Sequence, residues 1–373
     1  MKPESKIDNA DANRISYWIR PEIRALSAYH VPNPGNLIKL DAMENPYTWP
    51  ESLVDQWLEV LRDVSLNRYP DPNASRLKDR LREAMKVPDT MDILLGNGSD
   101  ELIQIIAMGI SGSNRAILAP EPTFSMYRMI ATFIGLEFIG VPLRNDFSLD
   151  LPALLATIEQ KRPAITFLSY PNNPTGNLFD PQQIKEIIHA SPGLVVVDEA
   201  YHAFAGRSFM NELANHDNLL VLRTVSKMGL AGLRLGLLAG PRAWLQEFDK
   251  IRLPYNINIL TQVSAEFALN HGEVFDEQTG KIRAERERLF TEMNHLKGIT
   301  VYPSQANFLL FRTFPEKAGK IFDSLKTSGV LIKNLSPAGE QLTDCLRVTV
   351  GRPEENDTFI QALKKALAVE SGE

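Results

Sequence analysis

Two short apolar runs near the middle of the chain constrain its fold more than any other feature. Residues 194–197 and 219–223 are almost continuously apolar, which is the pattern of parallel β-strands covered on both faces. Both runs lead within a few residues to polar side chains: Asp198, Tyr201, Ser226, Lys227 and Arg234. Ligands of open α/β sheets bind beyond the carboxyl ends of such strands. We therefore expect these five side chains to line one crevice.

A single ligand, pyridoxal 5'-phosphate, can use all five side chains. Its aldehyde needs an amine, and Lys227 can form a Schiff base with it. Its ring nitrogen has to stay protonated, which calls for a buried carboxylate such as Asp198. Tyr201 can donate a hydrogen bond to the ring hydroxyl, and Ser226 and Arg234 can bind the phosphate. Taken singly, an aspartate or a lysine is more often a solvated surface residue, so the inference depends on their joint occurrence.

Three turns place further candidate ligands near the ends of predicted strands. The Gly-Asn-Gly turn at 96–98 precedes Ser99 and Asp100, which open an apolar helix where backbone N–H groups can approach a phosphate. A glycine turn before a helix is also common without any ligand. Phe124 either stacks on a planar ring or packs in the core, with about equal weight. Asn173 follows a buried strand, where its amide can donate a hydrogen bond.

Strands and helices alternate along the middle of the chain, and this alternation predicts the fold class. It is typical of an α/β domain whose mostly parallel sheet is flanked by helices on both faces. After Gly240 long helices precede strand, helix–strand and strand–helix segments, which predict a smaller α+β domain. We expect an N-terminal arm at 1–47 that joins the small domain, a large domain at 48–270 and the small C-terminal domain at 271–373.

Arg347 and the N-terminal arm carry weaker candidates for ligand binding. Arg347 lies in a predicted strand between apolar residues, where it either forms a local salt bridge or recognises an anion in bidentate fashion. In the arm, Tyr29 and Asn45 are polar residues in predicted loops, where ligand contacts concentrate. For Asn45, which precedes Pro46, local evidence favours ordinary turn formation.

Composition argues against several other classes of protein. The 373 residues are 44% hydrophobic and 23% charged, as in ordinary globular proteins, and the formal net charge of -6 gives no electrostatic reason to bind nucleic acid. The apolar runs are too short to span a bilayer, and the polar N-terminus lacks the core of a signal peptide. The one cysteine, Cys345, cannot form an intrachain disulfide, which fits a cytoplasmic protein. We expect no nucleic-acid partner, no membrane partner and no metal.

Four motifs together resemble the fold-type I pyridoxal-phosphate aminotransferases: SYPNNPTGN, VVVDEAY, TVSKMGLAGLRLG and CLRVTVG. With KLDAMENPY, RYPDP and GNGSDELI added, the chain is similar to the histidinol-phosphate aminotransferases in particular. The resemblance runs from about Arg20 to the C-terminal helix. Relatives that act on aromatic amino acids or on phosphothreonine share most of these motifs.

The resemblance implies that most of the residues named above hold the cofactor. Lys227 would be the attachment point and then the base and acid of the proton transfer, and Asp198 would pair with the ring nitrogen. Tyr201 and Asn173 would bind the ring hydroxyl, and Phe124 would stack on the ring. The phosphate would be bound by the backbone of Ser99 and Asp100 and by Ser226 and Arg234. Tyr69 would reach it from the other subunit of a homodimer with shared active sites.

The resemblance also implies the substrates. Arg347 would bind the phosphate of L-histidinol phosphate in one half-reaction and the carboxylate of glutamate in the other. The remaining substrate candidates are Tyr29, Asn45, Tyr255 and Lys333. Lys333 stands where some relatives carry a second arginine, and Met43 where many carry asparagine. The implied reaction converts L-histidinol phosphate and 2-oxoglutarate to imidazole acetol phosphate and L-glutamate, within histidine biosynthesis.

Three alternatives remain open on the sequence. The first is an aminotransferase of the same fold for aromatic or a broad range of amino acids. The second is a decarboxylase for a phosphorylated amino acid, which releases carbon dioxide without 2-oxoglutarate. The third is a non-catalytic binding or regulatory protein, which the full set of catalytic groups disfavours.

Overall fold

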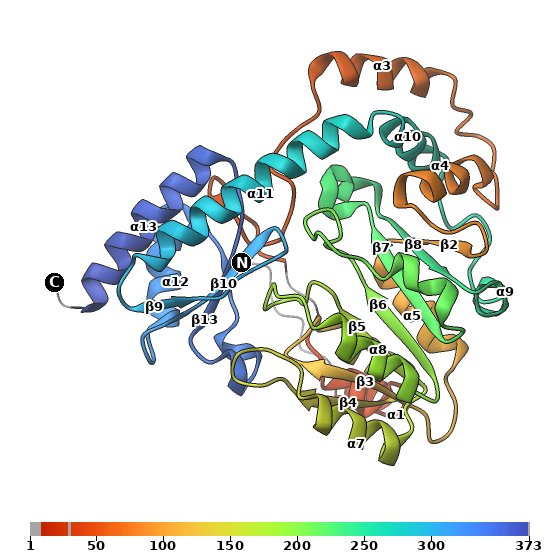
Figure 1. The fold of residues 1–373 in the computed structure, drawn as a ribbon, viewed down its shortest axis with the longest axis horizontal. Helices are drawn as coiled ribbons and strands as arrows, with labels where there is room; N and C mark the ends of the chain where they lie inside the picture. The colour runs from red at the N-terminus through yellow and green to blue at the C-terminus, as the bar shows by residue number, and fades with distance from the viewer. Residues whose placement is uncertain (1–8, 29–30, 372–373) are drawn as a thin grey trace.

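The structure, a computed structural model, describes residues 9–28 and 31–371 and contains two sheets that carry the functional residues. The larger sheet has seven strands in the order β2-β8-β7-β6-β5-β3-β4 (Figure 1). β8 runs antiparallel to both of its neighbours, and the remaining pairs are parallel. The strands are β2 (Asp92–Asn97), β3 (Ala116–Glu121), β4 (Glu137–Pro142), β5 (Ile165–Ser169), β6 (Leu194–Asp198), β7 (Leu219–Thr224) and β8 (Leu235–Gly240). The expected α/β class with a mostly parallel sheet is confirmed.

The apolar runs form the central strands because both faces of the sheet are covered. Along β6, Val195 and Val197 face one buried cluster, whereas Leu194 and Val196 face a second cluster on the opposite side. Strand β6 is buried at each of its five positions. A continuous apolar strand is stable only between two helical layers, which explains why alternation is absent from its sequence.

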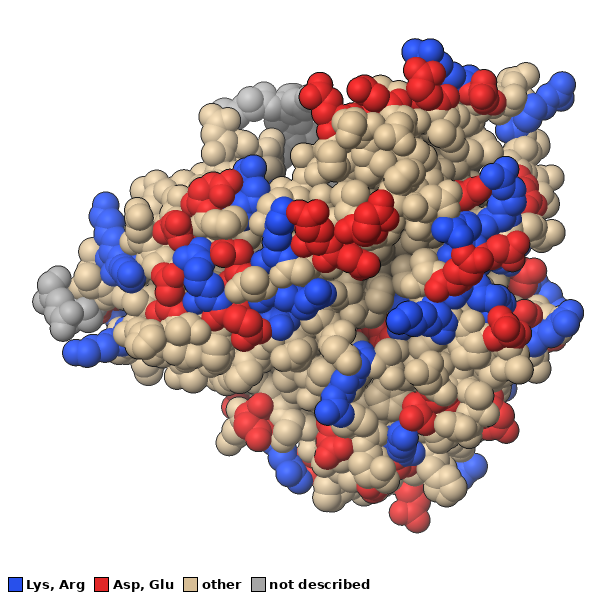
Figure 2. Space-filling model, turned by 45° about the horizontal axis from the view of Figure 1, so that its top comes forward, with Lys and Arg blue, Asp and Glu red and all other residues tan. Residues whose placement is uncertain are grey.

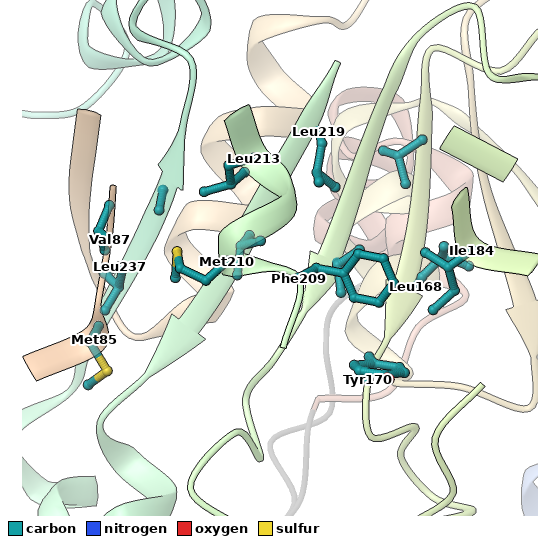
Figure 3. Packing of buried hydrophobic residues seen from close by; sticks show 14 of the residues in the cluster. Met85, Val87, Leu168, Tyr170, Ile184, Phe209, Met210, Leu213, Leu219 and Leu237 are labelled. Carbon is teal, nitrogen blue, oxygen red and sulfur yellow. The ribbon is translucent and has the colours of Figure 1, made fainter. Parts of the chain in front are cut away.

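Two sets of helices provide these layers. The first cluster includes residues of α4 (Ser75–Met85), α7 (Leu151–Lys161), α8 (Pro181–Ala190) and α10 (Ile259–Leu269). The second includes residues of α5 (Ser99–Gly109), α6 (Met126–Ile134) and α9 (Arg242–Asp249). Figure 3 shows part of the first cluster, in which Phe209, Tyr170 and Leu168 pack beside Ile184. α3 (Glu51–Arg62) contacts α10 outside these layers.

The small domain is an antiparallel sheet backed by helices. Its strand order is β12-β13-β10-β9. The elements are β9 (Ile299–Val301), β10 (Phe308–Thr313), α12 (Ala318–Thr327), β12 (Lys333–Asn334), β13 (Cys345–Thr349) and α13 (Pro353–Ser371). A third buried cluster joins this sheet to α12 and α13. The long helix α11 (Gly272–Asn294) runs from the large domain to the small one (Figure 1).

The N-terminal arm touches both domains. Its described part begins with the helices α1 (Asn9–Trp18) and α2 (Pro21–Arg24). α2 contacts α6 of the large domain, and the Arg20 guanidinium just before it donates to the carbonyl of Phe133 in α6. Further along, β1 (Ile38–Lys39) pairs with β11 (Val330–Leu331) in parallel. The arm is therefore fixed to the small domain immediately before the segment that reaches the candidate site.

Two further features of the fold are the apolar character of its helices and the distribution of charge on its surface. Within 9–28 and 31–371, no helix combines the length and apolar character needed to cross a bilayer. On the face drawn in Figure 2, basic and acidic side chains are interspersed over the helices rather than separated into patches of one sign.

Candidate active site

A pocket at the carboxyl ends of β5, β6 and β7 collects the residues that the sequence places after those strands. Every residue predicted to hold the cofactor from within one chain lines it. The lining is Met43, Gly98, Ser99, Asp100, Phe124, Ser169, Asn173, Asp198, Ala200, Tyr201, Thr224, Ser226, Lys227 and Arg234. In a parallel sheet these ends meet at one edge, as the register of Ser169 opposite Asp198 illustrates.

Asp198 is the last residue of β6 and is only 2% exposed. Its Oδ1 accepts a hydrogen bond from the backbone N–H of Ala200 at 3.0 Å, and its Oδ2 accepts one from the Tyr127 hydroxyl at 2.7 Å. Burial raises the pKa of Asp198 to about 6, although these two hydrogen bonds oppose the rise. Around neutral pH the carboxylate is therefore mostly ionised and held on both oxygens.

Lys227 lies in the turn of π-helix (Ser226–Leu230) that follows β7. Its Nζ donates to the carbonyl of Ala42 in the arm at 3.2 Å. Burial lowers the pKa of Lys227 to about 8, and the positive charge of Arg347 acts in the same direction. A lysine in this environment is a better nucleophile and base near neutral pH than an ordinary surface lysine.

The opposite end of the pocket is shaped to receive an anion. Ser99 and Asp100 begin the 11-residue helix α5 and line the pocket, and the first N–H groups of a helix have no partner within it, which suits them to bind an anion. Gly98, at φ +81°, leaves room for the Arg234 guanidinium, because a Cβ at this position would lie 2.8 Å from Nη2 of Arg234. Arg234 Nη2 also lies 3.5 Å from Asp100 Oδ2. Helix N-terminus, guanidinium and the hydroxyl of Ser226 together form an anion cradle.

These groups fit pyridoxal phosphate. The buried carboxylate of Asp198 suits a protonated ring nitrogen, and the lowered pKa of Lys227 suits reaction with an aldehyde. The cradle around Gly98 suits the phosphate, since its glycine admits a guanidinium that any side chain would displace. Among the described residues, no group of three or more His, Cys, Asp or Glu side chains is placed to hold a metal ion.

Asn173 links the pocket to the small domain. Its Nδ2 donates to the Tyr201 hydroxyl at 3.1 Å, and its Oδ1 accepts from Arg347 Nη1 at 2.6 Å. Arg347 lies in β13, is 7% exposed, and donates from Nη2 to the carbonyl of Asp41 at 3.1 Å. The Arg347 guanidinium also lies 5.2 Å from the ring centroid of Phe308. The predicted strand arginine is thus oriented by the arm and by the pocket.

The other predicted ligands lie outside the lining formed by the described residues of the pocket. Tyr69 is 81% exposed and stacks on Tyr255, with ring centroids 4.5 Å apart. Asn45 donates from Nδ2 to the Met228 carbonyl and to Gln278 Oε1, each at 2.9 Å. Lys333 pairs with Arg347 across β12 and β13. Tyr29 lies outside the described residues.

Several groups that contact the predicted site residues were missed by the sequence analysis, among them Tyr127 and the Ala42 carbonyl. Tyr127 donates to Asp198, and its position in the first turn of α6, three residues after the predicted ring-stacking Phe124, was the available signal. The Ala42 carbonyl accepts from Lys227. No sequence pattern indicates this contact, because it joins residues 185 positions apart.

A wider cleft, of about 960 Å³, lies between the β3–β4 edge and residues 338–342 of the small domain. Arg128, Arg144 and Arg312 contribute to its lining. Arg128 pairs with Glu121, and Arg312 donates to backbone carbonyls of residues 341 and 343, so both guanidinium groups are engaged within the protein. The smaller pocket combines a lysine, a buried carboxylate and an anion cradle, and it is therefore the candidate active site.

The fold and the groups of this pocket define an enzyme of the pyridoxal-phosphate-dependent fold type I. Residues 35–363 match the family described as aminotransferase class I and II, and the chain belongs to this family.

Two sequence relatives and one solved structure illustrate which aminotransferases the chain is similar to. The chain is 59% identical over 352 residues to histidinol-phosphate aminotransferase 2 of Nitrosococcus oceani, with 94% of this chain and 98% of that protein covered. It is 51% identical over 362 residues to histidinol-phosphate aminotransferase 2 of Cupriavidus pinatubonensis, with 96% and 98% covered. Its fold is similar to that of histidinol-phosphate aminotransferase from Sinorhizobium meliloti in complex with pyridoxal-5'-phosphate, with TM-score 0.82, 24% identity and coverage of 95% and 98%.

Proposed function

We propose that this aminotransferase converts L-histidinol phosphate and 2-oxoglutarate to imidazole acetol phosphate and L-glutamate, in histidine biosynthesis. The observation that carries the proposal is the convergence of Lys227, Asp198 and the anion cradle on one pocket, with Arg347 adjoining it through Asn173. The names of the N. oceani and C. pinatubonensis relatives support the choice of substrate.

Pyridoxal 5'-phosphate is the proposed cofactor. When bound, it supplies an aldehyde that takes up amino groups and a ring that withdraws electrons. Asp198 would hold the proton on the ring nitrogen, and Tyr201 and Asn173 would orient the ring hydroxyl. Burial raises the pKa of Tyr201, so its hydroxyl stays protonated and able to donate. The backbone N–H groups of Ser99 and Asp100, with the side chains of Ser226 and Arg234, would bind the phosphate.

Lys227 would move the proton at the substrate carbon that bears the amino group. Its amine, with a pKa of about 8, is neutral in a useful fraction near neutral pH and can accept this proton and return it. Phe124 lines the pocket where it can cover one face of the ring. The Ala42 carbonyl orients the amine before the cofactor binds.

Arg347 would bind the anionic end of each substrate. Both substrates carry an amine near an anionic group, so one guanidinium can serve both half-reactions in turn. Its hydrogen bonds to Asn173 and Asp41 fix the guanidinium beside the pocket, which reduces the entropy lost on binding. Lys333, which pairs with Arg347 from the neighbouring strand β12, would add a second positive charge.

The enzyme would act as a cytoplasmic homodimer with shared active sites. The stacked pair of Tyr69 and Tyr255 exposes aromatic surface of the kind that interfaces bury. In such a dimer Tyr69 would reach the cofactor phosphate of the partner's site. Sedimentation at micromolar concentration tests the assembly: a monomer with full activity would contradict shared sites.

A substrate panel on purified, cofactor-loaded protein tests the function. Histidinol phosphate, phenylalanine and tyrosine are compared as amino donors to 2-oxoglutarate, and carbon dioxide release is measured in parallel from phosphothreonine. The proposal expects the highest kcat/KM with histidinol phosphate. A preference for aromatic donors, or release of carbon dioxide without 2-oxoglutarate, would replace it with one of the other activities of this fold.

A further inference from the structure

The contact between Tyr127 and Asp198 is the only described side-chain hydrogen bond to that carboxylate, and it comes from a different layer of the fold. Tyr127 lies in the first turn of α6 and is fully buried at 0% exposure. Its ring stacks on Phe167 of β5, with centroids 4.5 Å apart and planes at 7°. It also meets the ring of Phe124 edge-on at 5.6 Å. Packing alone therefore fixes where the hydroxyl points.

The hydroxyl is not needed to fill the core. A phenylalanine would make the same two ring contacts without burying a polar group, and burying a hydroxyl is favourable only if it is hydrogen-bonded. Here the hydroxyl donates to Oδ2 of Asp198 at 2.7 Å. The local turn supplies the other hydrogen bond, from Ala200 to Oδ1. Each carboxylate oxygen is thus bound from one side, and lone pairs remain for the pocket that Asp198 lines.

We propose that Tyr127 is a positioning residue of the reaction, whose hydroxyl fixes the rotation of the Asp198 carboxylate and keeps it an ionised acceptor for the cofactor ring nitrogen. The inference rests on the proposed function for the identity of that nitrogen. Without the hydroxyl, the Ala200 contact alone leaves the carboxylate free to rotate about its Cβ–Cγ bond. The face presented to the cofactor would then no longer be fixed.

Electrostatics give Tyr127 a second effect on Asp198. The titratable groups around the carboxylate are Asp100 from α5, Tyr127 from α6, Glu199 and Tyr201 from its own segment, and Lys227 from the turn after β7. Asp100 and Glu199 raise the pKa of Asp198, as burial does, and the Tyr127 hydroxyl lowers it. Burial and the Asp198 charge raise the pKa of Tyr127, so its proton stays on the phenol. Removing the hydroxyl therefore moves the pKa of Asp198 upward, toward neutral pH.

Tyr127→Phe tests the proposal in the cofactor-loaded full chain, with Tyr170→Phe as the matched control. Tyr170 is also buried, at 1% exposure, and its ring packs edge-on against Phe209 in the cluster of Figure 3. The Tyr170 hydroxyl has no hydrogen-bond partner among the described residues. The control thus removes a buried hydroxyl of the same kind that does not touch Asp198.

Three readouts separate positioning from simple packing. For Tyr127→Phe we expect roughly tenfold weaker cofactor binding to the apoenzyme, measured by fluorescence quenching, because a hydrogen bond to a charged group is lost. We expect the midpoint of the pH titration of the bound cofactor's absorbance to move. We also expect kcat to fall about tenfold with KM little changed. In Tyr170→Phe all three should match the wild type, and the thermal unfolding of both apo variants should remain cooperative.

Unchanged cofactor affinity and an unchanged pH midpoint in folded Tyr127→Phe would overturn the proposal. If that variant does not fold, the contact can be tested in the wild-type protein, labelled with 13C at tyrosine Cζ, by following its tyrosine resonances in NMR spectra as the pH changes. One of the nine tyrosine resonances should shift as Asp198 titrates, and this shift should persist in Tyr201→Phe and vanish in Asp198→Asn. Its absence would contradict the contact. The cofactor titrations need no substrate, so they stand even if histidinol phosphate proves not to be the donor.

Discussion

The two walls of the active site are built in different ways. On the large-domain wall, Asp198 ends β6 and Lys227 lies three residues after the end of the neighbouring strand β7, and the Asp198 contact to Ala200 spans two residues. On the wall formed by the arm and the small domain, the contacts span far more of the chain. Arg347 binds Asn173 and Asp41, which are 174 and 306 residues away. The proposed cofactor end therefore takes its two main groups from strand ends of one domain, with longer-range support from Tyr127 and Ala42, whereas the proposed substrate end depends on how the domains and the arm pack.

The largest expected effect is on the large-domain wall. Lys227→Ala removes the amine that we propose attaches the cofactor and moves the substrate proton, so turnover should fall to background. Borohydride reduction followed by mass spectrometry should find no cofactor linked to the chain. Lys281→Ala, at an exposed lysine of α11 that pairs with Glu277, is the control and should retain both properties. Turnover that survives in Lys227→Ala would rule out its assigned role.

Glu199→Gln should have the next largest effect, a decrease in the free energy of unfolding. Glu199 is fully buried beside Asp198 and binds Arg223 through Nε and Nη2 at 2.9 and 2.8 Å. Loss of its charge leaves a buried guanidinium unpaired, which costs about 3–5 kcal/mol. Urea unfolding at fixed protein concentration measures the change. The exposed pair partner Glu277, changed to Gln, should unfold like the wild type, and equal effects of the two substitutions would contradict this account.

The pH dependence of cofactor attachment tests whether the large-domain wall buries Lys227 enough to lower its pKa. Only neutral Lys227 can attack an aldehyde, and burial lowers its pKa to about 8. The rate of covalent attachment to the apoenzyme should therefore rise about tenfold per pH unit below pH 8 and level off above it. Stopped-flow absorbance follows this rate. A rise that continues to pH 10, as for an ordinary lysine, would show that the buried environment is absent.

Arg347→Lys tests the wall that the small domain supplies. A lysine keeps the charge but loses the planar fork, so KM should rise about 10- to 100-fold for both histidinol phosphate and 2-oxoglutarate. Cofactor affinity should change less than KM, since a lysine keeps the positive charge beside the pocket and the guanidinium's hydrogen bond to a pocket residue goes to Asn173, not to a group of the anion cradle. A loss confined to one of the two substrates would mean that a different cation binds the other.

Asn45→Ala should have the smallest effect, a modest loss of stability, because it removes hydrogen bonds that hold the arm against the large domain and α11. Its amide joins the Met228 carbonyl, beside Lys227, to Gln278 of α11. Loss of these contacts costs about 1 kcal/mol each and should lower the melting temperature by a few degrees. Asn215→Ala, at a surface amide that binds Glu212, is the control. A large rise in substrate KM without a thermal shift would instead indicate direct substrate contact.

Strands β6 and β7 and the residue Tyr127 show which parts of the site could be predicted from the sequence and which could not. Strands β6 and β7 were predicted from continuous apolar runs, and the site residues that follow them lie in one pocket because parallel strands end at a common edge. Tyr127 was not predicted, since a tyrosine in an apolar helix is most often a core residue. Its proposed role depends on α6 packing over β5, which brings the Tyr127 hydroxyl within hydrogen-bond distance of Asp198.

The sequence by itself determined the order of strands and helices, and it placed a lysine and an aspartate at the ends of two of them. These features follow from local periodicity and from the chain connectivity, which act over a few residues. Only the tertiary structure decided that Ala42 would contact Lys227, that Asn45 would join the arm to α11, and that Arg347 would lie beside Asn173. Such contacts depend on the packing of segments far apart in the chain, and no local pattern encodes the distance between them.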